Sequence, residues 1–162
     1  MALSATERGA FLDRYEAGPA LLRQAWLELP PEARDWRPGE GRWSAHEVVV
    51  HCADSEAYAA IRIRLLLAEP EPLIVGYDEN AWARTFDYAA ADPQLCLGLV
   101  EALRAHTAAT LRRLPEGAWG RTGRHTHSGP YGTGDWLRIY AEHLEIHAAQ
   151  LRRNLAGWEQ RR

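Results

Sequence analysis

The pattern of apolar and polar positions along the chain predicts four long helices joined by irregular connections. They are expected over residues 4–29, 44–68, 92–114 and 134–155. No segment alternates between apolar and polar residues over enough positions to predict a sheet. Because each helix must bury its apolar face against another, we predict an all-α fold, a four-helix bundle formed as a single domain by residues 1–162.

Residues that favour helix ends mark where three of these helices begin. The S-A-T-E stretch from Ser4 and the S-A-H-E stretch from Ser44 each have the form of a capping box, in which side chains satisfy free backbone N–H groups. Asp92 is followed by Pro93, and proline fits the first helical turn because its missing N–H is not needed there. Inside the first helix, the pair Gly18 and Pro19 is expected to kink or break the helix, since proline removes a backbone hydrogen bond.

Two connections are long. Residues 69–91 join the second and third helices, with one helical turn expected at residues 79–84. A loop of this length inside a compact domain usually has a function, such as covering a site. The glycine-rich residues 115–135 precede the fourth helix, and a short hairpin is one conformation open to them.

Composition excludes several classes of function. The net charge of −3 and the isoelectric point of about 6.2 predict no basic surface, so no nucleic-acid partner is expected. All 19 basic residues are arginine, so neither a Schiff-base lysine nor a phosphate-loop lysine is available. None of the four serines lies in a G-x-S-x-G motif, which excludes a serine hydrolase of the nucleophile-elbow type.

Cysteine usage and hydropathy indicate the cellular setting. Cys52 and Cys96 do not form a disulfide framework, and Cys52 is expected to be a buried core thiol. No secretory signal opens the chain, and no apolar run approaches the ~18 residues that a membrane span needs. A cytoplasmic protein without a membrane partner is therefore expected.

The sequence YAEHLEIHAAQL places His143 and His147 four residues apart in the fourth predicted helix. Residues i and i+4 lie one above the other on a helix, so both imidazoles could bind one metal ion at about 2.0–2.1 Å. The order H-L-E-I-H differs from the H-E-x-x-H of zinc proteases, and Glu145 turns away from both histidines. Two histidines at this spacing also arise by chance in a chain with seven, so the pair alone does not establish a metal site.

A catalytic metal site with an open position needs a third protein ligand, and His51 is the best candidate. It lies about two turns into the second predicted helix, and bundles build metal centres from inward-facing side chains of different helices. The simpler alternative is a core histidine satisfied by hydrogen bonds. Four other histidines are weaker candidates: His46 in the first turn of the second helix, His106 on the third helix, and the H-x-H pair His125 and His127 in the glycine-rich loop.

Three short motifs follow one another along the chain. They are W-S-x-x-E-x-x-x-H-x-x-D at residues 43–54, Y-D-E-x-x-W at residues 77–82 and H-x-x-x-H at residues 143–147. Together they resemble the DinB/YfiT-like superfamily, in particular its YfiT-like branch, over most of the chain. The resemblance implies an up-down-down-up four-helix bundle, for which residues 69–91 would supply the long crossover between the second and third helices.

The resemblance also implies a divalent metal ion, nickel or zinc, held by three histidines. Carried over position by position, the ligands are His51, His143 and His147. YfiT-like proteins are described as metal-dependent hydrolases, some relatives transfer low-molecular-weight thiols such as bacillithiol, and many members are homodimers. The implied function is a thiol S-transferase or a hydrolase acting on small molecules, with the thiol as co-substrate in the first case. The alternatives are a non-catalytic metal- or ligand-binding stress-response protein and, more remotely, a metal-free helical interaction module.

Side chains near the expected ligands suggest how the site would work. A three-histidine centre leaves a position for water, or for a thiol that the metal deprotonates and so makes nucleophilic. Asp54, one turn after His51, is a candidate to orient a metal-bound water or a ligand imidazole, and a solvent-exposed carboxylate is the equal alternative. Arg62 and Arg64 are candidates to receive an anionic thiol, although surface ion pairs are the commoner role of such arginines.

The long connection supplies three candidate substrate-binding residues, Tyr77, Asp78 and Trp82. They are expected to line the mouth of the pocket, since a long loop inside a compact domain usually covers a site. Trp82 could equally serve only to pin this connection to the bundle. Three histidines suit zinc, nickel, iron and copper alike, so the choice of metal rests on the resemblance.

Overall fold

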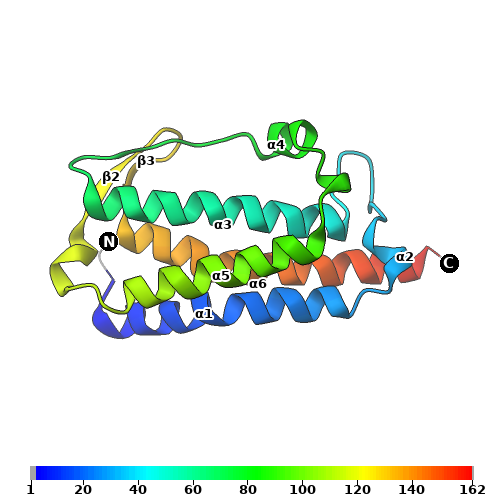
Figure 1. Cartoon of the computed structure of the whole chain (residues 1–162), viewed down its shortest axis with the longest axis horizontal. Helices are drawn as coiled ribbons and strands as arrows, with labels where there is room; N and C mark the ends of the chain where they lie inside the picture. Colours follow the sequence, from blue (N-terminus) through cyan, green and yellow to red (C-terminus); the bar gives the residue numbers. More distant parts are fainter. Residues whose placement is uncertain (1–2, 162) are drawn as a thin grey trace.

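The computed structural model describes residues 3–161, and four long helices dominate it. They are α1 (Ala5–Leu27), α3 (Ala45–Ala68), α5 (Pro93–Leu111) and α6 (Thr133–Gln160). All four run along the longest axis of the molecule, α1 and α6 in one direction and α3 and α5 in the other (Figure 1). The predicted up-down-down-up four-helix bundle is therefore confirmed, with the crossover after α3 running back over that helix toward α5 (Figure 1).

Short elements occupy the connections. They are α2 (Pro31–Arg34), α4 (Glu79–Thr85), the 3-10 helices η1 (Tyr88–Ala90) and η2 (Glu116–Gly120), and the strands β1 (Leu73–Ile74), β2 (Thr122–His125) and β3 (Gly129–Gly132). The expected helical turn is α4, and the hairpin considered for the glycine-rich loop is β2–β3. The expectation of no sheet is wrong, because β1 pairs parallel with β2 and β2 antiparallel with β3. Strands of two and four residues are too short to show the two-residue period on which a strand prediction depends.

Side-chain caps begin the helices as predicted. Ser4 and Ser44 each form a complete capping box, and the carboxylate of Asp92 accepts a hydrogen bond from the backbone N–H of Gln94. The C-terminal ends differ from the prediction by a few residues, since α1 and α5 end earlier and α6 continues to Gln160. Such end positions depend on tertiary packing more than on local sequence.

Helix α1 runs through Gly18 and Pro19 without a break, so of the two outcomes predicted, a kink or a break, the break is wrong. The proline still deprives the carbonyl oxygen of Tyr15 of its usual helical partner, the N–H four residues later. Arg104 on α5 donates to this oxygen through Nη1 at 2.7 Å. A guanidinium group from another helix thus replaces the missing backbone donor at this point of α1.

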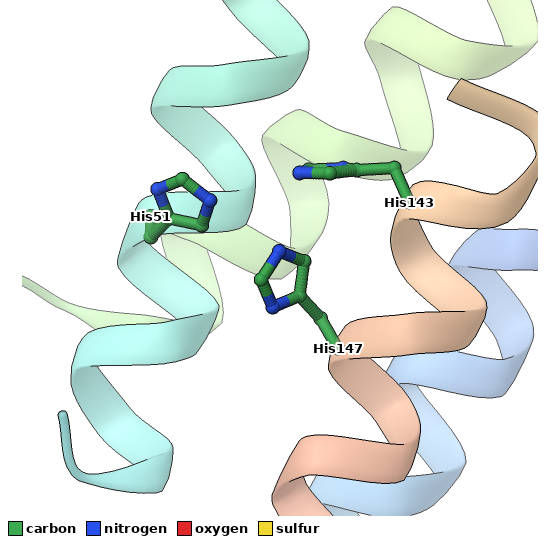
Figure 2. Close-up of side chains that lie close together, drawn as sticks. All are labelled: His51, His143 and His147. Carbon is green, nitrogen blue, oxygen red and sulfur yellow. The ribbon is translucent and has the colours of Figure 1, made fainter. Parts of the chain in front are cut away.

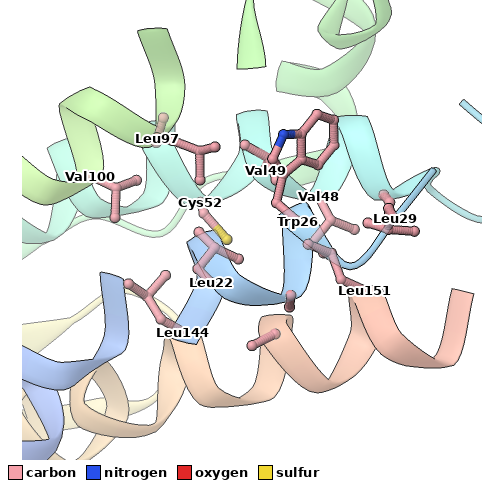
Figure 3. Close-up of a cluster of buried hydrophobic side chains, with 14 of the residues drawn as sticks. Leu22, Trp26, Leu29, Val48, Val49, Cys52, Leu97, Val100, Leu144 and Leu151 are labelled. Carbon is pink, nitrogen blue, oxygen red and sulfur yellow. The ribbon is translucent and has the colours of Figure 1, made fainter. Parts of the chain in front are cut away.

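Apolar side chains from all four long helices fill the bundle. Leu22 and Trp26 of α1, Val49 and Cys52 of α3, and Leu144 of α6 are almost fully buried around one centre (Figure 3). Burial of a side chain of this size contributes about 1.5–3 kcal/mol. Cys52 is a core thiol as expected, and burial raises its pKa. Within residues 3–161, no helix has both the length and the apolar character that crossing a bilayer requires.

Candidate metal centre

Three imidazoles face one another between α3 and α6. His51 comes from α3, and His143 and His147 come from successive turns of α6 (Figure 2). The three groups offer ring nitrogens that lie within 4.8 Å of one another. Ring centroids are 4.6 Å apart for His143 and His147, 4.9 Å for His51 and His147, and 5.7 Å for His51 and His143. A tetrahedral metal 2.0–2.1 Å from each nitrogen needs them about 3.4 Å apart, so modest side-chain rotations would close the site.

Helix geometry explains why these side chains meet. The four-residue spacing puts His143 and His147 on one face of α6, and this face is turned toward α3 (Figure 2). His51 is only 2% exposed, and its neighbours Val50 and Cys52 are also buried. The indole ring of Trp43 lies 4.8 Å from the ring of His51 and shields it. The three predicted ligands are thus brought together by two helices far apart in sequence.

Burial keeps at least two of the three imidazoles neutral. Desolvation, followed by the neighbouring His147 and His143, lowers the pKa of His51 to about 2. Desolvation and then His143 lower the pKa of His147 to about 4. Because a metal ion binds imidazole in its neutral form, both side chains are in the ligating state at neutral pH.

Hydrogen bonds orient the two rings on α6. Nδ1 of His143 donates to Oε1 of Glu56 at 2.9 Å, and Nδ1 of His147 donates to Oε1 of Gln150 at 2.9 Å. In both rings the proton is then on Nδ1, and Nε2 carries the lone pair that a metal needs. Metal-bound histidines commonly bond a carboxylate or another oxygen in this way, which fixes the ring and strengthens it as a donor.

Glu56 is fully buried on α3 and is ionised. Burial by itself would raise the pKa of its carboxyl group, but the charge of Arg104 and the hydrogen bonds from His143 and Arg104 outweigh it, so the pKa is lowered. An ionised carboxylate only accepts hydrogen bonds. The proton shared between Glu56 and His143 therefore belongs to Nδ1 of the imidazole.

The donor set fits a divalent metal ion. Imidazole nitrogens suit zinc and nickel, and the cluster gains no fourth histidine, cysteine or carboxylate from anywhere in residues 3–161. Nδ1 of His51 is buried without a hydrogen-bond partner. Buried polar atoms are almost always paired, so an imidazole in this state is consistent with a partner that is a bound ion or ligand.

Asp54 bonds Tyr88 and none of the three imidazoles, which corrects the prediction that it orients a ligand imidazole. Its Oδ2 accepts a hydrogen bond of 2.6 Å from the hydroxyl of Tyr88 and so ties η1 to α3. The carboxylate that bonds a candidate ligand is Glu56. Two residues correspond to about 200° around a helix, so the prediction chose the right helix and the wrong face.

Arg62 and Arg64 are engaged with the protein itself, so the prediction that they receive an anionic thiol is not supported. Arg62 donates to the backbone oxygen of Val75 at 2.8 Å and to the hydroxyl of Tyr140 at 3.1 Å. Arg64 donates to the backbone oxygen of Ala60 in its own helix at 2.6 Å. Arg62 therefore fastens the crossover to the bundle.

The three candidate substrate-binding residues of the crossover differ in what they contact. The rings of Tyr77 and Trp82 lie 5.2 and 5.8 Å from that of Tyr58 on α3, so Trp82 does pin this segment. Asp78 caps α4 by accepting a hydrogen bond from the N–H of Ala81 at 3.0 Å. The hydroxyl of Tyr77 is buried, and Ser55 is the neighbouring side chain that interacts with it. Substrate binding by these residues stays a prediction.

The other histidines lie apart from the centre. Both ring nitrogens of His46 lie within 3.0 Å of protein oxygens, so this side chain is engaged by Asp35 and Ala91. His106 is exposed on α5. His125 and His127 belong to the β2–β3 hairpin, and among the described residues they are outside the one cluster able to offer three ligands.

Sequence reasoning missed two residues that support the centre. Gln150 follows His147 by three positions, and this spacing on one helix face is a signal that could have found it. Glu56 gives no comparable signal, because its bond to His143 spans 87 residues of sequence and depends on how α3 packs on α6.

The chain matches the sequence model of the DinB superfamily over residues 14–151. The chain belongs to the DinB superfamily. Among its superfamily relatives, a protein of Oceanobacillus iheyensis named "putative metal-dependent hydrolase" is 34% identical over 141 residues, which cover 87% of this chain and 81% of the relative. YfiT of Bacillus subtilis, with the same description, is 31% identical over 150 residues, or 92% of this chain and 84% of YfiT.

Two solved structures agree with this fold. The solved structure of YfiT from Bacillus subtilis, described as a probable metal-dependent hydrolase with an unusual four-helix bundle topology, superposes with a TM-score of 0.88 and 30% identity over 94% of this chain and 88% of YfiT. A mycothiol-dependent maleylpyruvate isomerase superposes with a TM-score of 0.71 and 15% identity, covering 89% of this chain and 60% of the isomerase. The second likeness is one of fold alone.

Proposed function

We propose that this DinB-superfamily protein is a metal-dependent enzyme in which His51, His143 and His147 hold a divalent ion, zinc or nickel. The observation that carries the proposal is the convergence of three imidazoles, with no fourth histidine, cysteine or carboxylate among the described residues. Structural zinc sites close with four protein ligands, whereas catalytic sites keep one position for water or substrate. The names of the relatives from Oceanobacillus iheyensis and Bacillus subtilis support the same conclusion.

The chemistry would follow from an ion held by only three protein ligands at a buried interface between helices. When bound, the ion would supply Lewis acidity that makes a water or a thiol nucleophilic near neutral pH. The chain would hold three neutral nitrogens in place through Glu56 and Gln150, and Trp43 would keep solvent from His51.

A hollow beside the centre fits an anionic small molecule. It has a volume of about 430 Å³ and is lined by Pro38, Arg42, Trp43, Gln150, Arg153 and Asn154. Trp43 and Gln150 also contact His51 and His147, so the hollow adjoins two of the candidate ligands. No carboxylate of the described chain pairs with Arg42 or Arg153, and a guanidinium group binds carboxylates and phosphates well. We propose these two arginines, in place of Arg62 and Arg64, as the receivers of an anionic substrate or thiol.

Two reactions use such a site. Hydrolysis is favoured by the names of the relatives, and transfer of a low-molecular-weight thiol of the bacillithiol type is favoured by the likeness in fold to a mycothiol-dependent enzyme. The two differ in which nucleophile occupies the open position. Turnover of a model electrophile with a panel of thiols, compared with turnover of an ester panel in their absence, distinguishes them.

Metal analysis of the purified protein tests the centre directly. The expected content is one zinc or nickel ion per chain in the wild type and almost none in the double variant His51→Ala/His147→Ala. His106→Ala, which removes an exposed histidine on α5, is the matched control and should keep full content. Full occupancy in the double variant, or turnover that survives complete metal removal, would contradict the proposal.

The competing function is a non-catalytic metal- or ligand-binding protein. It would be favoured by a bound ion whose fourth ligand comes from the protein, which X-ray absorption spectroscopy of the metal-loaded protein would show. Homodimerisation, implied by the resemblance, stays a prediction that light scattering tests.

A further inference from the structure

We propose that the buried ion pair of Glu56 and Arg104 is a positioning device for His143, which holds the ring so that Nε2 points into the candidate metal centre. The inference rests on the proposed metal site and concerns residues outside it. It connects the centre through Arg104 to α1, where Gly18 and Pro19 accommodate the guanidinium group.

Glu56 divides its carboxylate between two partners. Oε2 accepts from Nε of Arg104 at 2.9 Å, and Oε1 accepts both from Nη2 of Arg104 at 2.6 Å and from Nδ1 of His143 at 2.9 Å. Glu56 and Arg104 are each only 1% exposed. The fork of the guanidinium group thus fixes the plane of the carboxylate, and the carboxylate fixes the ring of His143.

Arg104 is itself held by two backbone oxygens. Nη2 donates to the carbonyl of Tyr140, on the turn of α6 before His143, and Nη1 donates to the carbonyl of Tyr15, each at 2.7 Å. The second acceptor is free because Pro19 lacks the N–H that would normally bond it. A side chain at position 18 would obstruct this contact, since a Cβ there would lie 2.7 Å from Nη1 of Arg104.

Stability alone does not account for this arrangement. Bringing two charges into a core costs desolvation free energy, and buried ion pairs can often be replaced by apolar side chains without loss of stability. Unlike an apolar pair, the ion pair places an oxygen that can only accept a hydrogen bond next to Nδ1 of His143. That oxygen keeps the proton on Nδ1 and the lone pair on Nε2, which faces His51 and His147.

The test replaces the whole pair, so that no unpaired charge remains in the core. In Glu56→Leu/Arg104→Met we expect a folded helical protein whose zinc dissociation constant, measured by competition with a chromophoric chelator, rises by about 10–100-fold. Nitrogen-15 NMR of the metal-free protein should show the Nδ1–H tautomer of His143 in the wild type and a mixture of tautomers in the variant. A folded variant with wild-type zinc affinity and an unchanged tautomer would overturn the inference.

A matched control is available on the same helix as His143. Arg14 and Glu145 form a two-bonded ion pair between α1 and α6, at 2.9 and 2.6 Å, but Glu145 makes no hydrogen bond to either candidate ligand on α6. The variant Glu145→Leu/Arg14→Met removes the same two charges and should leave zinc affinity and the tautomer of His143 unchanged. Equal losses in both double variants would show a general effect of charge and contradict the inference.

The NMR measurement also separates this inference from the metal proposal. If the wild type binds neither zinc nor nickel, the proposed function fails, yet the tautomer of His143 in the metal-free protein still decides the positioning role. If the core variant does not fold, the wild-type spectrum decides alone. Dominance of the Nε2–H tautomer of His143 would refute the inference in either case.

Discussion

The chain contains two pairs of nearby histidines, and they differ in how their ring nitrogens are used. His143 and His147 stand on successive turns of α6 with ring centroids 4.6 Å apart, and both donate hydrogen bonds through Nδ1. His125 and His127 stand on the β2–β3 hairpin with centroids 5.6 Å apart. Nδ1 of His125 accepts hydrogen bonds from the backbone N–H groups of His127 and Ser128, at 3.2 and 3.3 Å.

This difference shows that spacing in sequence does not by itself make a metal site. The helical pair gains His51 as a third imidazole, and its rings are held by acceptors that leave Nε2 free. In the hairpin the ring of His125 is used to close a turn, and its proton is on Nε2 because Nδ1 is the acceptor. A site for a cation thus needs convergence and the correct tautomer together.

Removing one ring from each pair tests whether only the helical pair binds the metal. We expect His147→Ala to weaken zinc binding by more than about 100-fold, beyond the range typical for loss of a hydrogen-bond partner, because a direct ligand is lost. His127→Ala should leave the zinc dissociation constant unchanged. Competition titrations on both variants measure the difference, and comparable losses would mean that the hairpin also binds the metal.

Local periodicity predicted the four long helices and the common face of His143 and His147, whereas the helix order and the convergence with His51 were predicted from bundle packing and the family resemblance. Capping boxes at Ser4 and Ser44 set where α1 and α3 begin, and the four-residue spacing of His143 and His147 set their common face. These features are encoded within a few turns of helix, where backbone geometry decides the outcome.

Long-range contacts were beyond sequence reasoning. Pro19 lies inside an unbroken α1, and the carbonyl of Tyr15 that it leaves without a helical donor accepts from Arg104, 89 residues away in sequence. Asp54 and Glu56 both follow His51 closely, and only the packing of α3 against α6 decides which carboxylate meets an imidazole. The strands of the small sheet are equally non-local, since β1 lies in the crossover and β2 before α6.

Lowering the pH should destabilise the metal-free protein, because its buried imidazoles resist protonation more than those of the unfolded chain do. The pKa of His51 is lowered to about 2 and that of His147 to about 4, mainly by burial, whereas imidazoles of the unfolded chain titrate near 6.5. Between pH 6 and 4 the unfolded chain therefore binds protons that the native protein does not. As the pH is lowered from 6 to 4, the free energy of unfolding should therefore decrease by about 1 kcal/mol per pH unit for each of these histidines.

Urea unfolding of the metal-free protein at a series of pH values measures this slope. His51→Gln keeps a polar side chain and removes one titrating group, so the slope between pH 6 and 4 should be reduced. His106→Gln, at an exposed position of α5, should leave the slope as it is in the wild type. An unchanged slope in His51→Gln would mean that this imidazole is not held neutral by the fold.

A smaller effect should follow from removing the acceptor of His147 while keeping all three ligands. In Gln150→Ala, Nδ1 of His147 loses its partner at 2.9 Å, and zinc affinity should fall by roughly 10-fold. Gln94→Ala, which truncates an exposed glutamine at the start of α5, is the control and should have no effect. If Gln150→Ala binds zinc as tightly as the wild type, ring orientation on α6 is set by helix packing alone.

The smallest expected effect concerns the hairpin, where an imidazole serves as a turn-closing acceptor. His125→Ala removes the acceptor for two backbone N–H groups and should lower the free energy of unfolding by about 1 kcal/mol without changing zinc affinity. In His125→Asn a side-chain oxygen can accept the same N–H groups, as asparagine does in many turns, so most of this stability should return. Chemical denaturation of both variants measures the difference. Rescue by asparagine would show that position 125 needs an acceptor rather than an imidazole, whereas positions 143 and 147 need an imidazole whose second nitrogen is free.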